Sequence, residues 1–356
     1  MTQKIAIIGA GVLGSAIAWR LGRAGARVTL IDPEPGKGAS AASLAWLNAS
    51  FASDPVYNAL RRDSVALWQE LQTSHPDLPV RFPGAILFSD RDEDLAALTS
   101  PDPGRDETNR PLIQGDVRNI EPALATPPEQ AVHCPQDGYG EPAGLCAWFL
   151  EQATSHGVTL QRSRATGFDI AEGRVTGVAI EADTETAIVP ADTVILAAGI
   201  DLPGLLEHLG LTVHMANQPG LSMRTAPLDR RIGHILSTPH GDLWQGPDGR
   251  ILIASSAGDG ETTEQAANRA LRALDAMFGT DTTPETVTAR DRPIPADGRP
   301  AVGPLGPAGL YVVSMHSGMT LAPVMAEMVA REVLDKTPDP RLAPYRPDRA
   351  VLQGGP

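Results

Sequence analysis

The 356-residue chain has 29 Lys and Arg against 43 Asp and Glu, a formal net charge of −14, and 42% hydrophobic residues. This acidic balance argues against nucleic acid or an anionic membrane as a partner, because phosphate binding needs clustered Lys and Arg. No run approaches the roughly 18 apolar residues of a membrane span, and Cys134 and Cys146 suit neither a metal motif nor a disulfide framework. We expect a cytoplasmic protein of one or two domains, with no metal site.

The N-terminal stretch predicts a dinucleotide-binding turn. An apolar run, Ile5–Ile8, predicts a strand buried on both faces. Three glycines with G-x-G-x-x-G spacing follow it: Gly9, Gly11 and Gly14. In such a turn the first permits a tight bend, the second lets backbone approach a pyrophosphate, and the third lets helix pack on strand. A second predicted strand, Arg27–Ile31, ends in Asp32, where a carboxylate can bind the hydroxyls of a ribose.

The following segments interrupt this pattern. Residues 36–48 are small and Ser-rich, which suits either a backbone winding past a ligand or a flexible loop. Leu60–Leu71 predicts an amphipathic helix. Residues 79–128 are rich in Pro, Asp and Gly, with one strand at Ala85–Phe88, as expected if a second domain is inserted. A helix is predicted over Ala143–His156, after Pro142 and before Gly157.

The second half of the chain alternates strands and turns. Short strands are predicted at 159–161, 166–170, 175–182 and 186–189. The apolar strand 193–197 leads to Gly199 and is expected to return beside the first strand. Further strands are predicted at 232–236, 243–245, 251–255 and 310–314, with helices at 261–278 and 321–333.

Several of these motifs together resemble the FAD-dependent family that includes D-amino acid oxidase, glycine oxidase, sarcosine oxidase and bacterial D-amino acid dehydrogenases. The resemblance covers nearly the whole chain. It rests on the glycine turn with its acid and on four further motifs: Gly38-Ala39-Ser40-Ala41-Ala42-Ser43, Leu196-Ala197-Ala198-Gly199, Arg292-Pro293…Asp297-Gly298…Pro300…Gly303, and Ser317-Gly318-Met319-Thr320-Leu321-Ala322-Pro323. The two C-terminal motifs distinguish FAD from NAD.

The resemblance implies a mixed α/β fold, with a Rossmann-like FAD-binding domain and an inserted antiparallel β-sheet substrate domain. The FAD-binding domain is expected to be discontinuous, over residues 1–78, 142–214 and 292–337. The substrate domain is expected over 79–141 and 215–291, and residues 338–356 form a Pro-rich tail. Because no cysteine lies in the C-terminal region, non-covalent FAD is expected.

Site residues carry over from the family onto matching positions. The resemblance places the adenosine, pyrophosphate and inner flavin edge against the glycine turn and Val12, Leu13, Asp32, Pro33, Ala39, Ser40, Ser43, Leu44, Ala45 and Gly199. It places adenine near the backbone of Ala165. It places the pyrimidine end of the flavin against His316, Ser317, Gly318, Met319 and Thr320.

Arg292 falls on the family's carboxylate-binding arginine, and a guanidinium fork suits a carboxylate. The alternative is an ordinary surface arginine. Arg290, two residues away, is a candidate second anchor. His316 suits either substrate orientation and proton transfer or a structural role. Four further residues are possible pocket walls, with core packing as the alternative for both tryptophans: Trp46, Asn48, Trp244 and Gln245.

The expected reaction is oxidation of the C–N bond of a small amino acid or N-alkyl amino acid, by hydride transfer to flavin N5 and hydrolysis of the imine. The expected partner is a small carboxylate-bearing amine substrate. One alternative is an FAD-dependent 2-hydroxy acid dehydrogenase. Another is the FAD-binding subunit of a hetero-oligomeric amino acid or opine dehydrogenase, and a homo-oligomer is also open.

Overall fold

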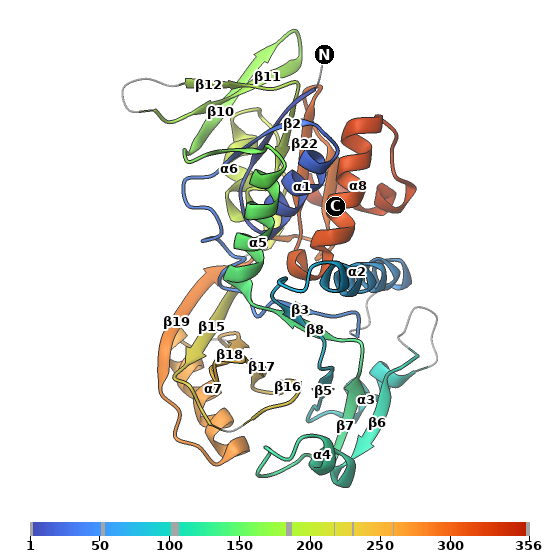
Figure 1. Ribbon diagram of the computed structural model, residues 1–356, viewed down its shortest axis with the longest axis vertical. Helices are drawn as coiled ribbons and strands as arrows, with labels where there is room; N and C mark the ends of the chain where they lie inside the picture. Colours follow the sequence, from blue (N-terminus) through green and yellow to red (C-terminus); the bar gives the residue numbers. More distant parts are fainter. Residues whose placement is uncertain are drawn as a thin grey trace. The chain divides into compact units, whose positions relative to one another are not determined.

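The computed structural model describes residues 3–50, 54–100, 107–182, 187–216, 218–229, 231–258 and 260–353. The chain folds into two compact units, each assembled from separate stretches of sequence (Figure 1). Unit 1 contains Met1–Ala41, Ala143–Gln218 and Asp291–Pro356. Unit 2 contains Ala42–Pro142 and Pro219–Arg290. The first stretch of unit 1 therefore ends at Ala41, whereas the first stretch of the FAD-binding domain was expected to end at residue 78.

The centre of unit 1 is a six-stranded sheet. Its order is β21 (Ala301–Pro304), β22 (Leu310–Ser314), β13 (Thr193–Leu196), β1 (Lys4–Ile8), β2 (Arg27–Ile31), β9 (Thr159–Gln161). All neighbours are parallel except β21 and β22. Ile7 lies opposite both Ile195 and Leu30, and all three side chains are buried. The predicted return of the strand at 193–197 beside the first strand is confirmed.

Helices pack around this sheet. They are α1 (Val12–Arg23), α5 (Pro142–Ser155), the short α6 (Leu202–Glu207) and α8 (Gly318–Asp335), with 3-10 turns at Gly199–Asp201, Pro340–Tyr345 and Ala350–Leu352. α1 lies beside α8 (Figure 1). Trp19 of α1 meets Trp148 and Phe149 of α5, with ring centroids 5.5 Å and 5.6 Å apart. These contacts fix α1, whose first turn carries the end of the glycine motif.

Two smaller sheets complete unit 1. One is antiparallel and contains β10 (Ala165–Ala171), β11 (Arg174–Ile180) and β12 (Ala187–Pro190). Val175 and Val178 of β11 share a buried cluster with Val194 and Leu196 of β13, which joins the two sheets. The other is a two-stranded ladder of β14 (Met215–Ala216) and β20 (Ile294–Pro295).

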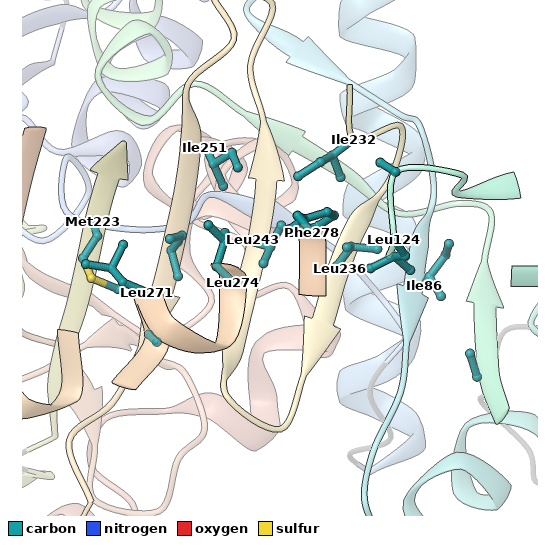
Figure 2. Close-up of a cluster of buried hydrophobic side chains, with 14 of the residues drawn as sticks. Ile86, Leu124, Met223, Ile232, Leu236, Leu243, Ile251, Leu271, Leu274 and Phe278 are labelled. Carbon is teal, nitrogen blue, oxygen red and sulfur yellow. The ribbon is translucent and has the colours of Figure 1, made fainter. Parts of the chain in front are cut away.

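Unit 2 contains an eight-stranded sheet with one parallel pair, β5 with β16. Its order is β19 (Pro284–Asp291), β15 (Pro219–Thr225), β18 (Ile251–Ser255), β17 (Gly241–Gln245), β16 (Ile235–Thr238), β5 (Ala85–Leu87), β7 (Gln130–Cys134), β6 (Arg110–Ile113). Helix α7 (Thr263–Phe278) covers one face. Figure 2 shows Leu271 of this helix beside Met223 of the sheet, and Leu274 and Phe278 on either side of Leu243.

The remaining elements of unit 2 are shorter, apart from one long helix. A three-stranded sheet has the order β3 (Trp46–Leu47), β8 (Gly138–Gly140), β4 (Val80–Arg81). The helices are α2 (Pro55–Ser74), α3 (Asp92–Thr99) and α4 (Gln114–Ile120). A second buried cluster joins Leu95 and Leu98 of α3 to Trp46 and Trp244. The compact division places α2 in unit 2 rather than with the first nucleotide-binding segment.

One predicted strand begins later than expected. The apolar pattern at 232–236 predicts a strand from Ile232, but β16 starts at Ile235. The backbone N–H groups of Gly233 and His234 instead donate to Glu121 Oε2, at 2.9 Å and 3.0 Å. The backbone N–H of Ile232 donates to the side chain of Gln245. A buried carboxylate and an amide therefore replace the neighbouring strand at these positions.

Candidate active site

The glycine turn of unit 1 leaves almost no room for side chains at two of its positions. Gly9 has φ 100°, a conformation that L side chains rarely adopt, and its N–H donates to Ile31 O at 2.9 Å. A Cβ at Gly9 would overlap the carbonyl oxygen of Ala197, and one at Gly14 would overlap the carbonyl oxygen of Gly9. These two glycines are required by contact between backbones, so they serve the fold.

Gly11 differs, because a side chain there would meet another side chain and no backbone atom. A Cβ there would meet only Ser40, with Oγ at 3.0 Å and Cβ at 3.9 Å. Ser40 Oγ accepts from the backbone N–H of Val12 at 3.1 Å, at the start of α1. The first N–H groups of a helix carry partial positive charge and lack partners within the helix. A helix terminus of this kind, begun by a residue without a side chain, suits a pyrophosphate.

Asp32 is held beside the glycine turn. Its Oδ2 accepts from the Ala10 N–H and its Oδ1 from the Glu34 N–H, both at 2.7 Å. Gly36 N–H donates to Ala10 O at 3.0 Å, so the segment after β2 folds back to the turn. Pro33 is exposed on this segment. The carboxylate therefore has a fixed orientation at the end of β2, as a ribose contact requires.

Two further segments meet the same region of unit 1. Ala197 N–H donates to Ile8 O at 2.8 Å, which brings the turn with Gly199 to the end of β1. A Cβ on Gly318 would lie 3.2 Å from Leu13 Cδ1, so the start of α8 lies against the start of α1. Within the Ser317–Thr320 motif Met319 and Thr320 are buried, and His316, just before it, is exposed. The structure thus brings together the glycine turn, Ser40, Asp32 and the first turn of α8.

Arg292 lies just before β20 and is half-buried. Its backbone N–H and its Nε both donate to the carbonyl oxygen of Gln218, each at 3.2 Å. Burial lowers the pKa of Arg292. Such burial of a guanidinium strengthens its attraction to an anion, because the surrounding dielectric is lower than in water. Arg290, by contrast, is exposed, and its guanidinium bonds the carbonyl oxygen of its own neighbour Ala289.

The predicted residues Ser43, Leu44 and Ala45 belong to unit 2 and form a strained turn. Ala45 has φ 51°, and its N–H donates to Ser43 Oγ at 2.7 Å. Gly140 N–H donates to Ala45 O at 3.0 Å, and Trp244 Nε1 donates to Leu44 O at 2.8 Å. An unfavourable backbone conformation in a non-glycine residue persists only where its surroundings enforce it. These bonds supply that enforcement.

Tyr139 and Asp137 were missed by the sequence analysis. Tyr139 stacks on Trp244, with ring centroids 4.0 Å apart and planes 12° from parallel. Asp137 is buried and accepts from Trp46 Nε1 at 3.0 Å and Ser50 Oγ at 2.6 Å. Burial raises the pKa of Asp137 to about 7, against the hydrogen bonds that lower it. The only local signal was the Asp137-Gly138 pair, which is typical of a turn.

The other predicted residues have mainly structural surroundings. Gln245 uses both ends of its amide on backbone, donating to Leu228 O and Gly249 O and accepting from Ile232 N–H. Asn48 is buried and accepts from Arg61 through both its backbone and side-chain oxygens. Ala165 begins β10 and packs on the core of unit 1, and half-buried Ala39 precedes Ser40.

Neither a metal cluster nor a membrane-spanning helix is found in the described part of the chain. Over those residues, no group of three or more His, Cys, Asp or Glu is arranged to hold a metal ion. Likewise, none of the described helices is long and apolar enough to cross a membrane. Cys134 and Cys146 are both buried and unbridged.

Comparisons with known proteins identify relatives over nearly the whole chain. The chain is 27% identical to the uncharacterized oxidoreductase YurR of Bacillus subtilis, covering 97% of this chain and 98% of that protein. It is 25% identical to a subunit of the opine oxidase of Agrobacterium tumefaciens, covering 92% of each. It is 26% identical to glycine oxidase of Pseudomonas aeruginosa, covering 98% of this chain and 99% of that protein.

Solved structures share the fold. L-amino acid deaminase from Proteus vulgaris superposes with a TM-score of 0.86 at 19% identity, covering 98% of this chain and 94% of that one. Glycine oxidase from Geobacillus kaustophilus superposes with a TM-score of 0.83 at 23% identity, covering 98% and 99%. The model of the FAD dependent oxidoreductase family matches residues 4–332. The chain therefore belongs to this family of FAD-dependent oxidoreductases, also called the DAO family.

Proposed function

We propose that this FAD-dependent oxidoreductase oxidises the C–N bond of a small amino acid or N-alkyl amino acid, with Arg292 binding the substrate carboxylate. The observation that carries the proposal is the half-buried guanidinium, held at Nε by the Gln218 carbonyl. Two relatives support an amine substrate that bears a carboxylate, since one is named a glycine oxidase and another a subunit of an opine oxidase.

The residues of unit 1 have separate roles in this proposal. The glycine turn, Ser40 and the start of α1 hold the pyrophosphate of non-covalently bound FAD, and Asp32 holds the ribose. The start of α8, from Ser317 to Thr320, directs its positive end at the flavin. Bound FAD supplies the hydride acceptor. Arg292 fixes the substrate by its carboxylate, so that one C–H beside the nitrogen has a defined position.

Substitution of Arg292 tests the proposal after a substrate has been found. The purified protein is screened anaerobically for flavin bleaching with amino acids, N-alkyl amino acids, the corresponding decarboxylated amines and 2-hydroxy acids. Charged hydrogen bonds are worth about 1.5–3 kcal/mol each. Two such bonds predict a loss of roughly 3–6 kcal/mol in kcat/KM for Arg292→Ala, on the order of a hundredfold or more.

Arg292→Lys should recover only part of this loss, because an ammonium cannot form the fork. FAD content, measured in the supernatant after heat precipitation, should stay unchanged in both variants. The proposal is wrong if Arg292→Ala turns over the best substrate within a few-fold of wild type. It is equally wrong if decarboxylated amines bleach the flavin as fast as the acids do.

The similarity to an opine oxidase subunit favours a second candidate, in which this chain is the FAD-binding subunit of a hetero-oligomeric dehydrogenase. The two candidates differ in whether the chain alone turns over. Flavin bleaching by an amino acid in the purified single chain supports the first candidate. A yellow protein that no acid, amine or hydroxy acid bleaches supports the second.

A further inference from the structure

The residues that follow α8 lie beyond the part matched by the family model, which ends at residue 332. In the sequence they are recognisable only as a Pro-rich tail. In the structure they form two 3-10 turns, Pro340–Tyr345 and Ala350–Leu352. Leu342, Tyr345 and Leu352 are each 0–1% exposed. We name residues 337–353 the C-terminal segment.

One end of the C-terminal segment is attached to α8 and the parallel sheet. Glu332 is buried, and its carboxylate accepts from Arg346 Nη1 at 2.9 Å and from Arg346 Nη2 at 2.6 Å. The same carboxylate accepts from Tyr311 of β22 at 2.5 Å and from the Asp339 N–H at 2.6 Å. Bidentate pairs of this kind are among the stronger hydrogen bonds of proteins. The segment therefore starts from a rigid support.

The other end is attached to the turn after β20. Arg349 donates from Nε to Asp297 Oδ2 and from Nη2 to Asp297 Oδ1, both at 2.7 Å. Arg349 Nη1 donates to Arg346 O at 2.9 Å, which ties the two attachments together. Burial would raise the pKa of Asp297, but the hydrogen bonds from Arg349 and the backbone of Arg299 outweigh it and lower that pKa. Asp297 is thus held as a carboxylate.

The segment also bonds the residues just before β14. His214 N–H donates to Leu352 O at 3.0 Å, and Gln353 Nε2 donates to Thr212 O at 2.8 Å. These residues precede β14, whose Met215 pairs with Pro295 of β20. The C-terminal segment therefore holds both strands of the β14–β20 ladder at the same end.

Arg292 lies at the opposite end of that ladder. Its carbonyl oxygen accepts from Ile294 N–H at 2.8 Å, and its N–H and Nε donate to Gln218, just past β14. Each strand of the ladder has only two residues. Isolated two-stranded ladders are marginally stable at best. The orientation of Arg292 consequently depends on what holds the ladder in register.

We propose that the C-terminal segment, acting through Arg349 and the β14–β20 ladder, is a positioning element that sets Arg292 for carboxylate binding. This rests on the proposed role of Arg292. Loosening the ladder at the end bonded by Arg349 changes the position of the Arg292 guanidinium at the other end. Small misplacements of an anchoring group weaken oriented binding steeply. We therefore expect a loss of affinity for the substrate and little change in the affinity for FAD.

The test compares Arg349→Ala with Arg341→Ala. Arg341 forms a similar bidentate pair, at 3.1 Å and 2.8 Å, but with Asp339 of the segment itself rather than with the turn after β20. Acetate is the probe, titrated against the FAD-loaded protein by the change in flavin absorbance. For Arg349→Ala we expect acetate Kd and substrate KM to rise roughly tenfold with kcat little changed. Arg341→Ala should stay near wild type, and Arg349→Lys should lie between.

A double-mutant cycle separates positioning from general destabilisation. If Arg349 acts through Arg292, adding Arg349→Ala to Arg292→Ala should not weaken acetate binding further. Hydrogen exchange should also quicken in peptides covering residues 212–218 and 291–299 of Arg349→Ala, and not in Arg341→Ala. Should Arg349→Ala fail to fold, Gln353→Ala removes the bond to Thr212 O, just before β14, and must shift acetate Kd in the same direction.

The outcomes distinguish the two proposals. An unchanged acetate Kd in Arg292→Ala overturns the proposed function. A weakened Kd in Arg292→Ala with a normal Kd in Arg349→Ala leaves that function standing and overturns the positioning role. Additive losses in the double variant also overturn it, because they place the effect of Arg349 outside Arg292.

Discussion

Gly11→Ala separates the glycine proposed to contact FAD from those required by the fold. Gly11 has φ −71° and ψ −172°, an extended conformation open to any residue. A methyl group there meets only Ser40, whose Oγ is 3.0 Å away at the end of a short side chain. Alanine also restricts the unfolded chain, which is worth about 0.4–1 kcal/mol where the native conformation is compatible. The apoprotein should therefore unfold within about 1 kcal/mol of wild type.

FAD binding should respond differently. The second glycine of such a turn is the one that lets backbone approach a pyrophosphate. Overpacking by a methyl group costs about 1–3 kcal/mol, and this corresponds to a rise of roughly 5- to 150-fold in the Kd of FAD. The assay is titration of apoprotein with FAD by flavin fluorescence, beside urea unfolding of the same apoprotein.

Gly14→Ala is the matched control, because its methyl group would overlap the Gly9 carbonyl oxygen. It should lose stability before any question of binding arises. The reasoning fails if Gly11→Ala binds FAD as wild type does. It fails also if Gly11→Ala destabilises the apoprotein as much as Gly14→Ala.

Two further predictions concern unit 2. Burial raises the pKa of Asp137 to about 7, so between about pH 4 and 7 the folded state keeps a proton that the unfolded state loses, and stability falls as pH rises. Burial lowers the pKa of His133 to about 4, so the contribution of His133 to stability rises with pH instead. Because both proteins contain His133, urea unfolding of wild type is compared with that of Asp137→Asn. From pH 5 to 7 wild type should lose up to about 2.7 kcal/mol relative to the variant, and a difference independent of pH would contradict this. In Trp244→Phe the buried Leu44 carbonyl oxygen loses the 2.8 Å hydrogen bond that Trp244 Nε1 donates. We expect the free energy of unfolding to fall by about 1–3 kcal/mol. Tyr139→Phe, which loses only a 3.4 Å bond, should cost much less, and equal losses would refute the assignment.

Local signals predicted the elements of unit 1 well. The strand at Arg27–Ile31 has the same bounds in the structure, and the predicted helix at 143–156 is α5 within one residue. An apolar run between turn residues, or a helix between Pro142 and Gly157, is specified by neighbours in sequence. The mixed α/β class and the FAD-dependent family were predictable for the same reason, since the motifs that identify them are short.

Contacts between distant residues were not predictable. The amphipathic pattern of α2 shows that one face is buried but not against which unit. The prolines after residue 337 mark a Pro-rich tail but do not show where it packs. It packs because Arg346 bonds Glu332 and Arg349 bonds Asp297, 52 residues away. Asp137 likewise meets Trp46 and Ser50 from 91 and 87 residues away. A single sequence carries no sign of such pairs.

This difference explains why candidate cofactor residues could be collected from the sequence and the contacts that support Arg292 could not. Gly9 follows β1, Asp32 follows β2, Gly199 follows β13 and Ser317 follows β22. These four strands are parallel neighbours, so their carboxyl ends share one edge. Ligands of such sheets bind at that edge. Reading the residues after each strand therefore collects the candidate cofactor site without knowledge of tertiary contacts.

Arg292 follows no strand of that sheet. It precedes a two-residue strand whose ladder with β14 is bonded at its other end by Arg349, Leu352 and Gln353, near the far end of the chain. A ladder of this length has little stability of its own. If Arg292 anchors the substrate as proposed, changes in the C-terminal segment would alter the position of its guanidinium and leave the candidate FAD site at the sheet edge intact. Under this proposal, substrate preference would vary through residues that lie outside every motif by which the family is identified.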